Sequence, residues 1–160
     1  MEYCQYDSPI GTLLLTSNEG ALTGVWMDAA APVDALLGGD NPVLLRTEQW
    51  LDRYFRGENP PVDIPLAPAG TEFQRLIWKL LTAIPYGQTR TYGSIAREAA
   101  ALLGKERMSA QAVGGAVGRN PISILIPCHR VVGADGQLVG YAGGLERKAW
   151  LLRREGWLKE

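Results

Sequence analysis

The segment Ile124-Leu125-Ile126-Pro127-Cys128-His129-Arg130-Val131-Val132 holds the only histidine of the chain, directly after one of its two cysteines. A thiol reacts as the thiolate, which forms when a base, a positive charge or a helix N-terminus lowers the pKa of the thiol. The apolar run before Cys128 predicts a buried strand that ends at Pro127. Such a strand would hold the sulfur at a fixed place in a rigid core. The pair alone is weak support for a reactive thiol, because most Cys-His dipeptides are accidental neighbours.

Length and composition exclude several classes of protein. The 160 residues carry a formal net charge of −1 and suit one globular domain or two small ones. No stretch has the length of a membrane span, and the acidic start does not resemble a signal peptide. Cys4 and Cys128 are too few for a disulfide framework and lack the spacing of metal ligands. We therefore expect a protein of the reducing cytoplasm, without a membrane, a metal or a cofactor.

The charge is divided unevenly along the chain. Residues 1–68 hold three basic and ten acidic side chains, a net charge of −7. Residues 69–160 hold thirteen basic and seven acidic side chains, a net charge of +6. A basic half indicates a polyanionic partner such as a nucleic acid. Charge alone fits equally well with the alternative that the two halves attract each other.

Residues 1–68 predict a small antiparallel-sheet α/β domain. Strands are expected at residues 3–6, 12–17 and 21–27, with turns at residues 8–11 and 18–20. Residues 29–41 are expected to form a loop or a poor helix. Asn41 caps the helix that begins at Pro42. Residues 59–70 contain four prolines and predict a linker with a short strand near residues 63–66, so the domain boundary is placed there.

Residues 69–160 predict a mainly helical domain. Thr71 and Gln74 form a capping box for a first helix. Thr91 caps a second helix that begins at Tyr92, and Ser109 caps a third that ends near residue 118. Two helices joined by a turn, with a polar cap on the second, are typical of a DNA-reading motif. An ordinary helical hairpin is the commoner use of such a pair.

The third helix is rich in small residues. Gly114 and Gly115 each cost about 1 kcal/mol relative to alanine, but they allow close approach to another helix or to a narrow nucleic-acid groove. A major-groove reader needs polar side chains along its face, and here only Gln111 and Arg119 qualify. The helix is therefore expected to make close contact rather than to read base edges.

The C-terminal end predicts a wing and a last helix. Asp135-Gly136 forms a turn that folds residues 137–139 back as a hairpin, and the last helix runs from Leu145 to Glu155. Glu155 lies at the unfavourable end of the helix dipole and needs a cationic or hydrogen-bonding partner, for which His129 is a candidate. The expected fold class is α+β, with an N-terminal α/β domain at residues 1–68 and a winged helix-turn-helix domain at residues 69–160.

Several motifs together resemble one protein family. Asn120-Pro121, Ile126-Pro127-Cys128-His129-Arg130-Val131, Tyr141-Ala142-Gly143-Gly144 and Trp150-Leu151-Leu152 are similar to motifs of the O6-alkylguanine-DNA alkyltransferases. The resemblance covers roughly residues 71–157 and includes residues 85–92. The N-terminal half is similar only in layout.

The resemblance implies a DNA repair protein that acts once per molecule. It would transfer an alkyl group from O6-alkylguanine, and from O4-alkylthymine, in duplex DNA to Cys128 after flipping the base out of the helix. His129 would deprotonate the thiol through a water and would be oriented by Glu155. Asn120 would hold the turn that presents the thiol. Tyr92 would rotate the nucleotide and hydrogen-bond the leaving guanine.

The base pocket and the DNA contacts are implied in the same way. The backbone carbonyls of Cys128 and Val131 would accept from the exocyclic amine, and the N–H of Ala142 would contact O6. Other pocket residues would be Tyr141 and Gly143. The residues facing the minor groove, which is about 6 Å wide, would be Thr91, Tyr92, Ala110, Gln111, Ala112, Gly114, Gly115 and Arg119. Double-stranded DNA is the expected partner of a monomer, and cooperative assembly on DNA is left open.

Two features depart from the family pattern. Gln111 stands where the family usually has an arginine that is inserted into the base stack, and glutamine lacks the charge and the stacking plane of a guanidinium. Either flipping is less efficient, or Arg107 or Arg119 takes part. The loop Ala101–Met108 is also longer than usual.

Three other classes of protein fit parts of this sequence. A cysteine hydrolase could use Cys128, His129 and Asn120, although that class normally brings cysteine and histidine together from distant segments. A non-catalytic protein that recognises alkylated DNA would carry tryptophan in place of the cysteine. A winged-helix regulator would leave the Cys-His pair without a purpose.

Overall fold

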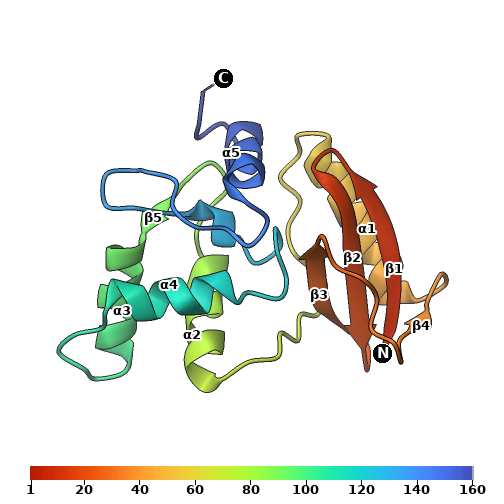
Figure 1. Cartoon of the computed structure of the whole chain (residues 1–160), viewed down its shortest axis with the longest axis horizontal. Coiled ribbons are helices and arrows are strands. Elements are labelled where there is room, and N and C mark those ends of the chain that lie inside the picture. Colours follow the sequence, from red (N-terminus) through yellow and green to blue (C-terminus); the bar gives the residue numbers. More distant parts are fainter. Residues whose placement is uncertain (160) are drawn as a thin grey trace. The chain divides into compact units, whose positions relative to one another are not determined.

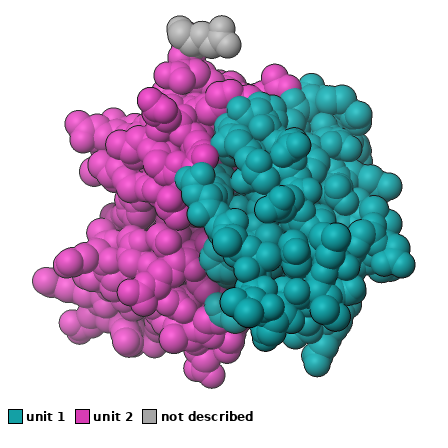
Figure 2. Space-filling view, turned by 45° about the vertical axis from the view of Figure 1, so that its right-hand side comes forward, with its two compact units in different colours: residues 1–69, 121–123 teal, residues 70–120, 124–160 magenta. Residues whose placement is uncertain are grey.

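The computed structural model describes residues 1–159 and divides into two compact units. Unit 1 comprises Met1–Ala69 and Pro121–Ser123, and unit 2 comprises Gly70–Asn120 and the chain from Ile124 onwards. Figure 2 shows unit 1 in teal and unit 2 in magenta. The α+β class is confirmed, with a sheet in unit 1 and a mainly helical unit 2.

Unit 1 contains the antiparallel meander that the turn signals predict. Its strands are β1 (Glu2–Ser8), β2 (Gly11–Asn18), β3 (Ala21–Met27) and β4 (Leu36–Leu37), in the spatial order β3-β2-β1-β4. Gly11 and Gly20 have positive φ angles of 112° and 80° in the two hairpin turns, where a side chain would be strained. The short strand β4 pairs in parallel with β1. It lies in a segment that was expected to be a loop or a poor helix.

Helix α1 (Pro42–Phe55) packs against this sheet (Figure 1). Asn41 caps the helix as expected, because its Oδ1 accepts from the N–H groups of Val43 and Leu44. The rings of Trp50 and Tyr54 stack with centroids 5.4 Å apart on the buried side of the helix. The amphipathic pattern of residues 42–55 therefore produces the core of unit 1.

Two distant segments complete unit 1 by pairing with β3. The N–H of Val25 donates to Pro121 O at 2.9 Å, and the N–H of Ser123 donates to Val25 O at 3.2 Å. Leu22 forms a bridge to Leu66 in the same way, where a short strand was expected. These contacts satisfy backbone groups that an edge strand would otherwise leave unpaired. In the structure, residues 121–123 therefore group with residues 1–69, although they lie within the range 69–160 that the sequence analysis expects to form the second domain.

Unit 2 contains the predicted helices with the predicted caps. They are α2 (Glu72–Thr82), α3 (Tyr92–Leu102), α4 (Ala110–Gly118) and α5 (Leu145–Arg154). Thr71, Thr91 and Ser109 each accept a hydrogen bond from the N–H three residues further on. The indole N–H of Trp78 donates to Ala116 O at 2.8 Å and ties α2 to α4. Two short strands, β5 (Arg90–Thr91) and β6 (Val131–Val132), pair in parallel.

Two expectations in unit 2 are wrong. The buried run Ile124–Ile126 is not a strand, because Ile124 has a φ of +72° and the carbonyl of Ile126 accepts from Asn120 and Cys128 instead of from a neighbouring strand. The turn at residues 134–136 forms, but residues 137–139 make no strand. The N–H of Gly133 donates to Gln137 O at 2.8 Å, but β6 pairs with β5 and not with residues 137–139.

No helix within residues 1–159 has the length and apolar character needed to cross a membrane.

Candidate active site

Cys128 begins a single 3₁₀ turn, η1 (Cys128–Arg130), that follows directly after Pro127. Its N–H donates to Ile126 O at 2.8 Å, and the same carbonyl accepts from Asn120 Nδ2 at 2.8 Å. The Asn120 side chain therefore holds the turn that presents the thiol. Cys128 is only 5% exposed. Its fixed position comes from this hydrogen-bonded turn and not from a strand end.

The thiol lies at a cavity of about 150 Å³ in unit 2. A cavity of about this size in another protein accommodates a benzene molecule, so one aromatic ring fits here. The lining residues are Tyr92, Gly114, Val117, Gly118, Cys128, Gly140, Tyr141 and Ala142. The structure thus brings together five of the residues predicted from the sequence. Val117, Gly118 and Gly140 were missed, since a small or apolar side chain carries no chemical signal.

His129 and Glu155 meet outside the lining of this cavity, with both side chains fully buried. The Nε2 atom of His129 is 2.6 Å from Oε2 of Glu155. Arg130 donates from Nε to Oε1 at 2.7 Å and from Nη2 to Oε2 at 3.1 Å. The carboxylate at the end of α5 therefore has two partners, of which sequence analysis proposed only His129.

The pKa shifts of these groups define a resting state. Burial alone raises the pKa of Glu155, but the hydrogen bonds from His129 and Arg130 and the charge of Arg130 oppose it, and the pKa falls to about 2. Burial lowers the pKa of His129 against the opposing effect of Glu155. The carboxylate is therefore ionised, and the neutral imidazole donates from Nε2, which leaves Nδ1 unprotonated. Nδ1 is buried and has no hydrogen-bond partner among residues 1–159.

The Cys128 thiol is protonated in this resting state. Burial raises its pKa, and the hydrogen bond from Asn120 and the charge of Lys148 only partly oppose that effect. The thiol is thus inert until a base removes its proton. This arrangement suits a nucleophile that is activated only with a substrate in place.

Lys148 is a fully buried cation that sequence analysis missed. Its Nζ donates to Val139 O at 3.3 Å and to Gly140 O at 3.1 Å. The hydroxyl of Tyr92 donates to the same Val139 carbonyl at 2.9 Å. Burial lowers the pKa of Lys148 to about 8, against the opposing charge of Cys128. Lys148 and Tyr92 therefore fix the backbone that forms one wall of the cavity.

The predicted DNA-contacting residues lie mostly on one exposed face of α4. Ala110, Gln111, Ala112, Gly115 and Arg119 are exposed, and none of them lines the cavity. A Cβ atom placed on Gly115 or Gly118 would meet no atom within 4 Å. Gly115 and Gly118 therefore do not serve as spacers for another helix of this chain, whereas a Cβ on Gly114 would lie 3.9 Å from the Tyr92 ring.

The remaining predicted residues have structural partners. Thr91 caps α3 by accepting from the N–H of Ser94. Val131 donates its N–H to Cys128 O and continues into β6. The Gly143 carbonyl accepts from Arg147 at 3.3 Å, and Gly143 lies outside the cavity lining.

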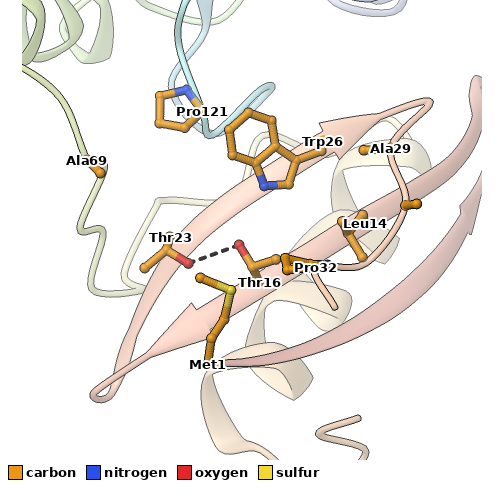
Figure 3. A pocket seen from close by; sticks show the side chains of 10 residues that line it. Met1, Leu14, Thr16, Thr23, Trp26, Ala29, Pro32, Ala69 and Pro121 are labelled. Atoms are coloured by element: carbon orange, nitrogen blue, oxygen red, sulfur yellow. Dashed lines mark hydrogen bonds between the residues drawn. The ribbon is translucent and has the colours of Figure 1, made fainter. Parts of the chain in front are cut away.

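Unit 1 holds a larger cavity of about 420 Å³ that has no group for chemistry (Figure 3). Trp26, Leu14 and Pro32 supply much of its apolar lining, and Thr16 and Thr23 hydrogen-bond each other at 2.9 Å. None of its lining residues is a cysteine, histidine or carboxylate. Along residues 1–159, no group of three or more histidine, cysteine, aspartate and glutamate side chains could hold a metal ion.

Comparisons with known proteins cover both units. Residues 72–157 match the 6-O-methylguanine DNA methyltransferase, DNA binding domain, and residues 1–68 match the 6-O-methylguanine DNA methyltransferase, ribonuclease-like domain. The chain is 45% identical over 159 residues to the methylated-DNA–protein-cysteine methyltransferase of Methanosarcina acetivorans, covering 98% of this chain and 99% of that protein. It is 43% identical over 157 residues to the protein of that name from Haemophilus influenzae, covering 96% and 85%.

A solved structure agrees with this result. The crystal structure of Mycobacterium tuberculosis OGT in complex with DNA superposes with a TM-score of 0.86 at 42% identity, covering 97% of this chain and 92% of that one. With such identity along nearly its whole length, the chain belongs to the family of 6-O-methylguanine DNA methyltransferases.

Proposed function

We propose that the protein repairs DNA directly, by moving the alkyl group of O6-alkylguanine in duplex DNA onto Cys128. The observation that supports this most is the position of Cys128 in the lining of a cavity, with the next residue, His129, placing its Nε2 atom 2.6 Å from Oε2 of Glu155. A single chain supplies every one of these groups, so a monomer is sufficient for the reaction.

The proton of the thiol passes to His129. Nδ1 is the unprotonated nitrogen, and a water between Sγ and Nδ1 carries the proton because consecutive residues of a 3₁₀ turn point in different directions. The ionised Glu155 stabilises the imidazolium that forms. Arg130 keeps that carboxylate in place through its two hydrogen bonds.

The alkyl transfer is a displacement at carbon. The thiolate of Cys128 forms a C–S bond to the alkyl carbon while the C–O6 bond breaks, and the electron pair of that bond stays with the guanine. Burial raises the pKa of Tyr92, so its hydroxyl remains protonated, and it exchanges its hydrogen bond to Val139 O for one to the leaving base. The thioether product has no route back to the thiol, and each molecule reacts once.

Access to the lesion requires that the base leave the duplex. Flipping costs a few kcal/mol, and the cost is smaller for a badly paired base, which favours alkylated guanine. The exposed small residues of α4 suit the narrow minor groove. Gly114 and Gly118 belong both to this helix and to the cavity lining, so α4 connects the DNA surface to the thiol.

Intact-protein mass after incubation with a duplex that contains one O6-methylguanine tests this proposal. We expect one added methyl group per chain, located on Cys128 by peptide mapping, and no change with an undamaged duplex. Label on Cys4, or release of more than one equivalent of repaired duplex per chain, would contradict it.

A further inference from the structure

A group of basic side chains lies in unit 2 outside the thiol cavity. The loop that joins α3 to α4, at the lower left of Figure 1, borders a separate cavity of about 330 Å³. Four charged residues line it, namely Arg97 on α3 and Lys105, Glu106 and Arg107 on the loop. We refer to these four residues as the basic pocket. A water takes about 30 Å³ of liquid volume, so the pocket has room for a phosphate group with several waters.

The backbone of the loop explains why these residues meet. Gly104 has a φ of +66° and ends α3 in the left-handed conformation. The N–H of Lys105 then donates to Ala100 O at 2.9 Å, and the N–H of Gly104 donates to Ala101 O at 3.3 Å. The chain therefore turns back along the last turn of α3, which brings the loop cations beside Arg97.

The basic pocket holds more positive than negative charge. Arg97, Lys105 and Arg107 take part in none of the ion pairs that the structure describes within residues 1–159. By contrast, Arg90 on β5 is paired with Glu98 on α3. Three cations face a single carboxylate, Glu106, which leaves two positive charges in excess. Like charges held together repel each other, and an external anion relieves that repulsion.

We propose that the basic pocket binds a backbone phosphate of the duplex that α4 contacts. This inference rests on the proposed function. The walls of a DNA groove are the sugar–phosphate backbones, so a helix that enters the groove brings the turn before its N-terminus against one of them. The pocket lies at that turn, directly before the cap Ser109. A phosphate held there supplies part of the electrostatic affinity that Gln111 lacks as an uncharged side chain.

Equilibrium binding of the full chain to an undamaged duplex, measured from low to moderate salt, tests the inference. We expect Lys105→Gln/Arg107→Gln to lose about tenfold in affinity and to lower the slope of log affinity against log salt by about 0.9, the value for one phosphate. Glu106→Gln is expected to tighten binding, because it removes the one repelling charge. The matched control is Arg53→Gln/Arg56→Gln, which removes two cations of unit 1 and should leave affinity and slope unchanged.

An unchanged slope in the loop variant, or an equal loss in the control, would overturn the phosphate site. A different contrary result is that inorganic phosphate competes with the duplex more strongly than chloride does at equal ionic strength, while the salt slope of Lys105→Gln/Arg107→Gln equals that of the wild type. That result would assign the pocket to free phosphate instead of a DNA phosphate. Reaction with free O6-benzylguanine keeps the two proposals apart. This reaction should proceed at the wild-type rate in Lys105→Gln/Arg107→Gln. Absence of alkyl transfer in the wild-type protein would refute the proposed function and not the phosphate site.

Discussion

The Nε2 atom of His129 lies 2.6 Å from Oε2 of Glu155, and both side chains are fully buried. This contact decides which imidazole nitrogen can act as a base. The ionised carboxylate accepts a hydrogen bond from the protonated Nε2, so the neutral ring carries no proton on Nδ1. Arg130 also forms an ion pair with this carboxylate, so removal of the charge of Glu155 affects both His129 and Arg130.

We predict that Glu155→Gln slows the reaction with free O6-benzylguanine by about 10- to 100-fold, part of the usual contribution of a general base. The amide can still hydrogen-bond, but it does not stabilise the imidazolium. The rate should be followed by labelling of Cys128 over time. Arg130→Lys keeps a cation beside Glu155 and should lose less, and a Glu155→Gln variant with the wild-type rate would remove His129 from the mechanism.

The stability of the protein should fall in acid through Glu155. Its pKa is about 2 in the folded protein against an ordinary value of 4.5, so its stabilising effect is complete above pH 4.5 and is lost as the pH falls toward 2. The full effect is on the order of 3 kcal/mol. Urea unfolding at pH 7, 5, 4 and 3 measures it. The difference in unfolding free energy between wild type and Glu155→Gln should shrink along this series, and a constant difference would contradict the argument.

Local signals in the sequence predicted the helices well. Asn41, Thr71, Thr91 and Ser109 each cap the helix that was expected, because a cap depends on residues within one turn. Long-range pairing was not predictable in the same way. The bridges from β3 to residues 65–67 and 121–123 join segments about 40 and 100 residues apart, and no local pattern encodes them.

Sequence analysis predicted those residues of the candidate site that have a reactive or charged side chain or that belong to a family motif. The unfavourable place of Glu155 in α5 pointed correctly to its contact with His129. Lys148 was missed, although it shares one helical face with Leu151, Leu152 and Glu155 at spacings of three, four and seven residues. A lysine on a buried face was a usable signal. The positive φ of Ile124 was not, because isoleucine rarely adopts it and the surrounding contacts impose it.

Lys148→Met should separate stability from activity. The folded state releases the lysine proton near pH 8, whereas an unfolded chain keeps it to about pH 10.5, so wild-type stability should rise with pH between these values. The variant should lack this rise in urea unfolding and be no less stable at pH 7. Its reaction with O6-benzylguanine should slow by about tenfold, because the positive charge of Lys148 lowers the pKa of the Cys128 thiol and so favours the thiolate. A destabilised variant with the wild-type rate would contradict both expectations.

Cys128→Ser should bind the alkylated duplex and transfer nothing, since an alkoxide is far harder to form than a thiolate. Cys4→Ser is the matched control. Burial and the charge of Glu48 raise the pKa of Cys4 to about 11, so this thiol stays protonated and should play no part. Gel-shift binding and intact mass measure the two properties. Loss of transfer in the Cys4 variant, with its fold intact, would show that the nucleophile was assigned wrongly.

Gln111→Arg should raise the rate of repair on duplex DNA and leave the reaction with free O6-benzylguanine nearly unchanged. Free base needs no extrusion, so its rate reports only the thiol, its base and the cavity. Duplex substrate adds the cost of unstacking, which an inserted guanidinium offsets by stacking and by bonding to the orphaned base. Gln111 is exposed on α4 and does not line the cavity, which keeps the two effects apart. Single-turnover rates on the two substrates measure the difference. If Arg107 or Arg119 already fills the gap, the added cation crowds it and duplex repair gains nothing, whereas equal changes on both substrates would place the effect of position 111 in the active site.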